Sequence, residues 1–140
     1  MEKQHKNTIS IIFQITGTRI TFCYGAKAYT EYIKENFGVD SKIEWCGCST
    51  ELTNKEKYEI VVGVRKYKDI YALKGLIVHE LNHTVSQLME YFNFNCDELR
   101  SYTLQHLYQE IMPFIDEIVI KDYDINIKKK THKRGKHNGK

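Results

Sequence analysis

The sequence predicts an α+β fold: a small, mainly antiparallel sheet with one helix, followed by a two-helix hairpin. Two observations support the fold. β-branched and alternating segments are concentrated in the first half of the chain, and apolar residues at helical spacing are concentrated in the second half. The chain has 140 residues, which fits one domain with its own core. We expect the helices to pack on one face of the sheet.

Four strands are expected in the first half. Thr8–Ile15 is rich in β-branched residues, and Thr18–Tyr24 alternates apolar and polar side chains after a short turn. Two further strands are expected at Lys42–Cys48 and Glu59–Val64, joined by the polar residues 49–57.

Three helices are expected. The first covers Ala26–Asn36, where apolar residues recur at helical spacing, and Gly38 follows as a C-terminal stop. The second, Leu73–Phe92, is long and apolar, and a start near Ile70 is an alternative. The third covers Glu98–Met112, and Pro113 is expected to end or kink it, since proline lacks a backbone N–H. Continuation of this helix over Phe114–Ile120 is the alternative.

Charge divides the chain into a body and a tail. The formal net charge is +3, yet residues 128–140 contain seven Lys or Arg and no acid, which leaves the rest of the chain mildly acidic. We therefore expect a flexible N-terminus at 1–7, a single domain at 8–127 and a basic disordered tail at 128–140. The tail is expected to contact nucleic acid or another anionic partner weakly, if it binds anything. The composition of the whole chain is not that of a nucleic-acid-binding domain.

No signal peptide or membrane-spanning run is visible in the sequence. The cysteines are therefore expected to be reduced thiols in a cytoplasm, that of a bacterium or of a phage-infected host, with association with a virion as an alternative. Cys46 and Cys48 are one residue closer than in the usual CxxC zinc knuckle, and no second pair completes a site. Their role stays open.

The motif with a chemical meaning is His79-Glu80-Leu81-Asn82-His83, which has the form HExxH. Histidines four residues apart project from one face of a helix, where both rings can reach a single Zn²⁺ ion. Glu80 lies about 100° around the helix, beside the metal, where a carboxylate can act as the general base. The alternative is a histidine pair with ordinary protein partners, but burying two His and a Glu without partners is costly.

A catalytic zinc site usually has a third protein ligand. The next helix begins at Asp97-Glu98 and can return antiparallel to the motif helix. We favour Glu98 as this ligand because of its reach, and Asp97 as a helix cap. His106 is a weaker choice. Tyr102 follows Glu98 by four residues and is expected either to steady Glu98 or a substrate oxyanion, or to be a core tyrosine.

The other three histidines, His5, His132 and His137, are expected to face solvent in flexible ends.

The pattern of His79, Glu80 and His83, a gap, and then Asp97-Glu98 resembles the gluzincin type of zincin. It is similar to small phage and bacterial proteins in which HExxH is followed by a helix that begins DEA-x-AY, with Leu99 and Ser101 here in place of the alanines. The resemblance implies a minimal zincin-like fold in which the two-helix hairpin binds zinc. By this resemblance, His79, His83 and Glu98 are the zinc ligands and Glu80 is the base. It also implies that Glu59–Val64 is the edge strand that pairs with an extended peptide substrate.

Two classes of function follow. The first is a zinc-dependent metallopeptidase-like protein that hydrolyses peptide bonds. The second is a zinc-binding phage structural or interaction protein without peptidase activity. Glu80 favours the first, since a structural zinc site does not need an acid at that position. Small size and the lack of a visible specificity region favour the second. A nucleic-acid accessory protein that uses the basic tail is a third and weaker idea.

Overall fold

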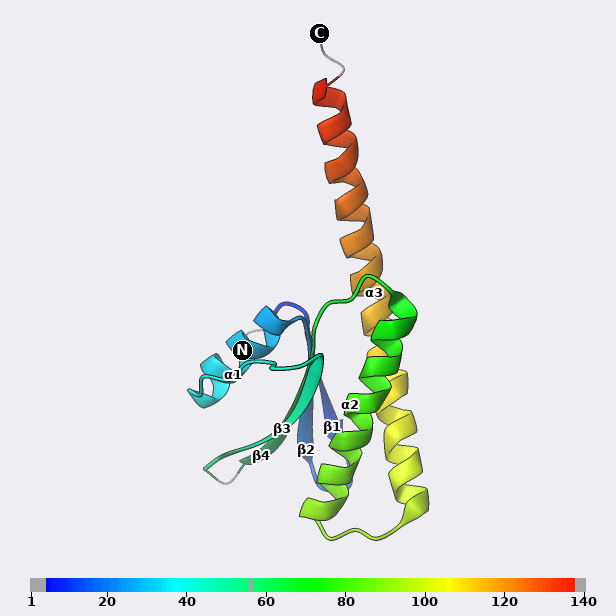
Figure 1. Ribbon diagram of the computed structural model, residues 1–140. Coiled ribbons are helices and arrows are strands. Elements are labelled where there is room, and N and C mark those ends of the chain that lie inside the picture. Colours follow the sequence, from blue (N-terminus) through cyan, green and yellow to red (C-terminus); the bar gives the residue numbers. More distant parts are fainter. Residues whose placement is uncertain (1–4, 56, 138–140) are drawn as a thin grey trace.

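The computed structural model describes residues 5–55 and 57–137 and has an α+β fold (Figure 1). Its elements are β1 (Thr8–Phe13), β2 (Thr18–Tyr24), α1 (Ala26–Phe37), β3 (Gly47–Asn54), β4 (Lys57–Val64), α2 (Ile70–Tyr91) and α3 (Asp97–His137). The predicted α+β class is confirmed.

One mixed sheet has the strand order β1-β2-β4-β3. The outer pairs, β1 with β2 and β3 with β4, are antiparallel, and the central pair, β2 with β4, is parallel. The chain turns tightly between β1 and β2, where Gly17 has a φ of 72° and its N–H donates to the Phe13 carbonyl at 2.8 Å. The strands at the edges are therefore β1 and β3.

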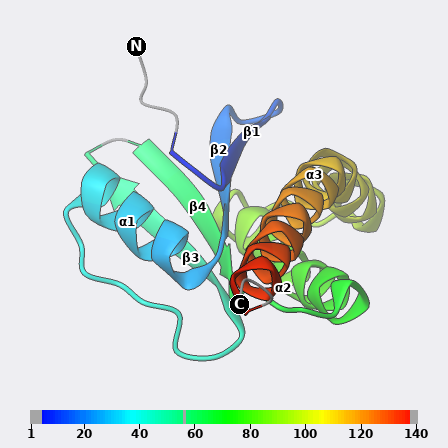
Figure 2. The same ribbon diagram turned by 90° about the horizontal axis from the view of Figure 1, so that it is seen from above.

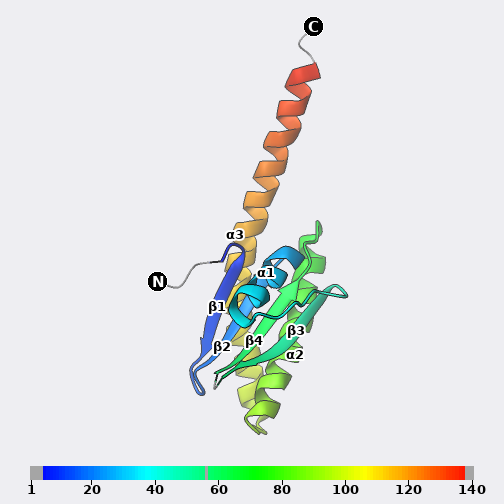
Figure 3. The same cartoon turned by 90° about the vertical axis from the view of Figure 1, so that its left-hand side faces the viewer.

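Both faces of the sheet are covered, and this corrects the expectation of helices on one face. Figures 2 and 3 show α1 on one side of the sheet and α2 with α3 on the other. The division follows from the alternation of side chains along the strands. Phe22 and Val62 are buried toward α2 and α3, whereas Cys23 and Val61 are buried with Tyr29 of α1.

The third strand is displaced along the sequence from its expected place. It begins at Gly47 instead of Lys42 and includes most of the polar segment expected to be a connection. The cause is the register with β4, in which Gly47 lies opposite Val64 and Asn54 opposite Lys57. An edge strand tolerates the Ser, Thr and Glu side chains of this segment because much of it stays in contact with water.

Helix α3 passes through Pro113 without ending, so helix does continue over Phe114–Ile120, and it extends well beyond Ile120. Ile111, Met112 and Ile115 are buried around the proline, and this packing holds the helix on both sides of it. The helix also continues through most of the expected tail, as far as His137, and projects beyond the rest of the molecule (Figure 1). Residues 138–140 lie outside the described residues. Lys128–Lys133 are exposed, as expected for a solvated basic segment.

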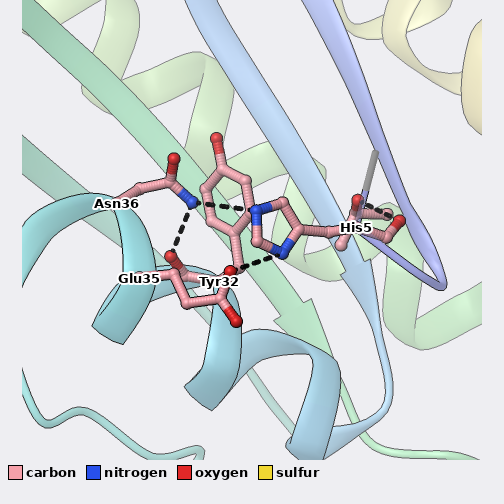
Figure 4. Close-up of polar contacts among 5 residues, drawn as sticks. His5, Tyr32, Glu35 and Asn36 are labelled. Atoms are coloured by element: carbon pink, nitrogen blue, oxygen red, sulfur yellow. Dashed lines mark hydrogen bonds and ion pairs between the residues drawn. The ribbon is translucent and has the colours of Figure 1, made fainter. Parts of the chain in front are cut away.

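His5 does not face solvent as expected. Figure 4 shows it against α1, where its ring packs edge-on against Tyr32 with a centroid distance of 5.1 Å. Its Nδ1 lies 3.5 Å from a carboxylate oxygen of Glu35, and Asn36 Nδ2 lies 3.4 Å from its Nε2. Residues 1–4 of the expected flexible N-terminus lie outside the described part of the chain. His132 is exposed, as expected.

Candidate metal site on helix α2

Helix α2 presents the HExxH motif because its apolar stripe fixes its rotation. The helix begins after Asp69, whose side chain accepts hydrogen bonds from the N–H groups of Tyr71 and Ala72. Leu73, Ile77 and Leu81 are fully buried against the sheet. The opposite face is therefore turned outward, and both motif histidines are exposed on it.

The two histidine rings converge. Nε2 of His79 and Nε2 of His83 are 3.2 Å apart, and the ring centroids are 4.8 Å apart. Two nitrogens that each lie about 2.0–2.1 Å from a tetrahedral zinc ion are separated by about 3.3–3.4 Å. The observed separation is thus close to the one that a shared zinc ion requires. In the absence of metal, the same separation allows an N–H of one ring to donate to the other.

Glu80 points the other way, into the space between α2 and the sheet. It is only 6% exposed. A Cβ placed on Gly47, the first residue of β3, would lie 2.9 Å from Glu80 Cγ and 3.1 Å from its Oε1. Burial raises the pKa of the Glu80 carboxyl, and positive charge on His79 and His83 opposes this rise. The Glu80 carboxyl therefore lies next to the first residue of the edge strand β3, on the same helix as the two histidines.

Strand β3 is fastened to the motif helix by side chains. Ser49 Oγ lies 2.8 Å from Thr84 Oγ1 and donates to Gln87 Oε1 at 2.6 Å. Gln87 Nε2 in turn donates to the Ser49 carbonyl at 2.9 Å. The edge strand beside the motif is therefore β3. The expectation that Glu59–Val64 forms this edge is wrong, because β4 pairs with both β2 and β3.

The residues expected to complete the site are less closely gathered. Glu98 and Asp97 form the first turn of α3, and both are exposed. Among the residues that the structure describes, no three His, Cys, Asp or Glu side chains are grouped closely enough to hold a metal ion. His106 is exposed, and Tyr102 is 65% exposed, so Tyr102 is not a core tyrosine. The structure thus brings the rings of His79 and His83 together, buries Glu80 on another face of the same helix, and leaves Glu98 outside the histidine pair.

Arg100 is a neighbour of the motif that the sequence did not indicate. Its Nη2 donates to Asn82 Oδ1 at 2.6 Å, and its Nη1 donates to Ser86 Oγ at 2.8 Å. These hydrogen bonds join α3 to α2 and help to fix the register between the two helices. They also give Asn82, a residue within the HExxH motif, a structural role. Predicting them requires the register of the helix hairpin, which the sequence pattern does not specify.

The cysteines are free thiols. Cys46 is exposed, and Cys48 is half-buried, with a pKa that burial raises. Cys23 is buried beneath α1, where desolvation raises its pKa far more. A raised pKa disfavours the thiolate, which is the reactive and metal-binding form.

Comparison of the chain with models of protein families, with curated proteins and with solved structures finds no match. In the described part of the chain, no helix is both long and apolar enough to cross a membrane.

Proposed function

We propose that this protein is a zinc-dependent hydrolase of peptide bonds, with its metal held on α2. The observation that supports this most directly is the 3.2 Å separation of the His79 and His83 ring nitrogens on an exposed helix face. Imidazole nitrogens are preferred zinc ligands, and this pair has the spacing that zinc needs. Glu98, from the next helix, is proposed as the third ligand because of the resemblance to gluzincins.

In this proposal the residues of the chain have distinct tasks. His79 and His83 hold the metal, which when bound supplies a Lewis acid that polarises the scissile carbonyl. Glu80 accepts a proton from the attacking water on its carboxylate and delivers it to the leaving amine nitrogen. Burial between α2 and β3 keeps this carboxylate in a fixed place. Tyr102 is proposed to steady either Glu98 or the developing oxyanion.

The substrate strand is proposed to lie along β3. This strand has one described neighbour, β4. Its first residue, Gly47, packs closely against the Glu80 side chain. An extended peptide can add to such an edge through its backbone, which supplies affinity with little demand on sequence. The small size of the chain fits this simple mode of recognition.

The test compares wild type with Glu80→Gln, His79→Ala and His83→Ala. Purified wild type should contain about one zinc ion per chain, and both His variants should lose it. Glu80→Gln should keep zinc and fold but cleave a peptide library at least 10²-fold to 10⁴-fold more slowly, on the order expected for loss of a general base. Equal cleavage by wild type and Glu80→Gln at matched zinc content would mean that a contaminant cleaves the peptides.

A second candidate is a zinc-binding interaction protein without hydrolysis. The small size of the chain, which leaves little material for a region that selects a substrate, favours it. Zinc bound by wild type without cleavage of any peptide in the library would support this alternative over the first.

A further inference from the structure

A second surface of the molecule lies away from the motif, between α3 and the connection from β4 to α2. There a groove of about 990 Å³ opens. Its lining includes Lys66, Tyr67 and Lys68 from the connection and Lys129, Lys130 and Lys133 from α3. Figure 1 shows α3 projecting past this connection, so that one wall of the groove is a helix and the other an irregular segment.

The groove is strongly basic. Five lysines line it, and Asp122 is the single carboxylate among the lining residues in the described part of the chain. That carboxylate lies 3.4 Å from Lys66 Nζ, which also sits 5.3 Å from the centroid of the buried Tyr24 ring. The three α3 lysines are exposed. Because the chain before residue 128 has more acidic than basic residues, this groove is a local concentration of positive charge on an otherwise acidic body.

Positive charge on both walls of one groove favours a linear anion that runs between them. An aromatic ring is available beside the charges, since Tyr67 is 38% exposed. Lysines along a groove with an exposed aromatic ring are the combination that binds single strands, because the lysines contact successive phosphates and the ring stacks on a base. A linear chain fits between two walls better than a flat membrane surface does, and an acidic peptide gains less from the ring.

We propose that this groove binds single-stranded nucleic acid, with Lys66, Lys68, Lys129, Lys130 and Lys133 contacting phosphates and Tyr67 stacking on a base. The inference does not depend on the metal site, because the groove shares no residue with His79, Glu80 or His83.

The test is fluorescence anisotropy with a labelled oligothymidylate of about 20 nucleotides, long enough to exceed a typical site. Wild type should bind it, and log K should fall linearly with log salt between roughly 50 and 200 mM, with a slope of about −0.7 for each phosphate contact. Lys129→Gln/Lys130→Gln/Lys133→Gln should weaken binding at least tenfold and make this slope about two units shallower. Tyr67→Ala should weaken binding about fivefold or more, and Tyr67→Phe, which keeps the ring, should restore it.

The matched control is Lys27→Gln/Lys42→Gln/Lys55→Gln, which removes the same charge from exposed lysines elsewhere. It should bind within about twofold of wild type, since most of its effect is screened. Loss equal to that of the groove variant would overturn the proposal, as would failure of wild type to bind at the lowest salt. Tighter binding of a DNA duplex, of polyglutamate or of phosphatidylserine vesicles would assign the groove to another partner. The salt slope of wild type tests the proposal without any variant.

Discussion

At the scale of single residues, the absence of a side chain at Gly47 leaves the space that the Glu80 side chain occupies. A Cβ on Gly47 would lie 2.9 Å from Glu80 Cγ and 3.0 Å from the Gly63 carbonyl oxygen, so Gly47→Ala must displace one of them. We expect a loss of about 1–3 kcal/mol in the free energy of unfolding, measured by urea denaturation. If the proposed hydrolysis occurs, its rate should fall as well, because the carboxylate moves.

Gly75→Ala is the control for this prediction. Gly75 lies within α2, and a Cβ there meets no atom within 4 Å. Alanine should therefore stabilise the protein by roughly 0.5–1 kcal/mol, through helix propensity alone. If both glycine variants behaved alike, close contact at Gly47 would not be the explanation.

Glu98 and Asp97 are adjacent carboxylates with different proposed roles. Glu98→Gln should weaken zinc affinity at least about tenfold, because an amide is a much poorer ligand for zinc than a carboxylate. Asp97→Asn should leave zinc affinity unchanged and reduce stability by about 1 kcal/mol or less, since it removes only a charge that favours a helix N-terminus. Competition with a chromogenic chelator measures both affinities. Loss of zinc in Asp97→Asn with retention in Glu98→Gln would reverse the two roles.

At the scale of elements, local sequence pattern predicted the bounds best where a segment contributes many side chains to the core. The strand Thr18–Tyr24 has the predicted bounds, and the first helix ends one residue later than predicted, before Gly38, whose φ of 67° fits the expected stop. β3 was misplaced because its polar side chains give no alternating pattern, and pairing with β4 alone sets its position. The proximity of His79 and His83 could be predicted from helix geometry. The identity of the edge strand beside Glu80 could not, because it depends on the order of strands in the sheet and local sequence pattern does not specify that order.

The packing of α1 on the sheet buries the hydroxyl of Tyr32 beside Glu59. Tyr32 of α1 donates to Glu59 Oε1 of β4 at 2.7 Å, and Thr21 of β2 donates to the same oxygen at 2.6 Å. Burial, together with the hydrogen bond to Glu59, raises the pKa of Tyr32 to about 12, although the Thr21 hydroxyl, 3.2 Å from the Tyr32 hydroxyl, acts in the opposite direction. This phenol is therefore more easily ionised in the unfolded chain, where its pKa is near 10.

This difference in pKa predicts an alkaline loss of stability. Between about pH 10 and 12 the unfolded state releases the Tyr32 proton first, so the stability present below pH 10 falls as pH rises, by on the order of 2–3 kcal/mol. Tyr32→Phe should cost about 1–2 kcal/mol near pH 8, where the hydrogen bond to Glu59 is lost. Its disadvantage relative to wild type should shrink above pH 10. A constant difference in urea-unfolding free energy from pH 8 to 11 would contradict this assignment.

At the scale of the whole molecule, the sheet separates two layers with different tasks. The α1 layer closes one face, and the α2–α3 layer holds the candidate metal site on the other. Glu80 lies where that layer meets the edge strand β3. The basic groove is formed farther along α3, so the same long helix borders both candidate sites.

The part of α3 beyond residue 127 is expected to be dispensable for folding. Among the described side chains of α3, the partly buried apolar ones that pack on the core extend as far as Val119, and Lys128–Lys133 are exposed. Deleting residues 128–140 removes backbone hydrogen bonds of an isolated helix end, which are marginal in water, and no core contact of a described side chain. The free energy of unfolding should change by less than about 0.5 kcal/mol, and zinc content should not change.

Far-ultraviolet circular dichroism of this deletion variant should show the lost helix. Its affinity for oligothymidylate should fall at least about tenfold, because three of the five groove lysines are removed. A drop of several kcal/mol in stability would mean that this helix end packs on the domain.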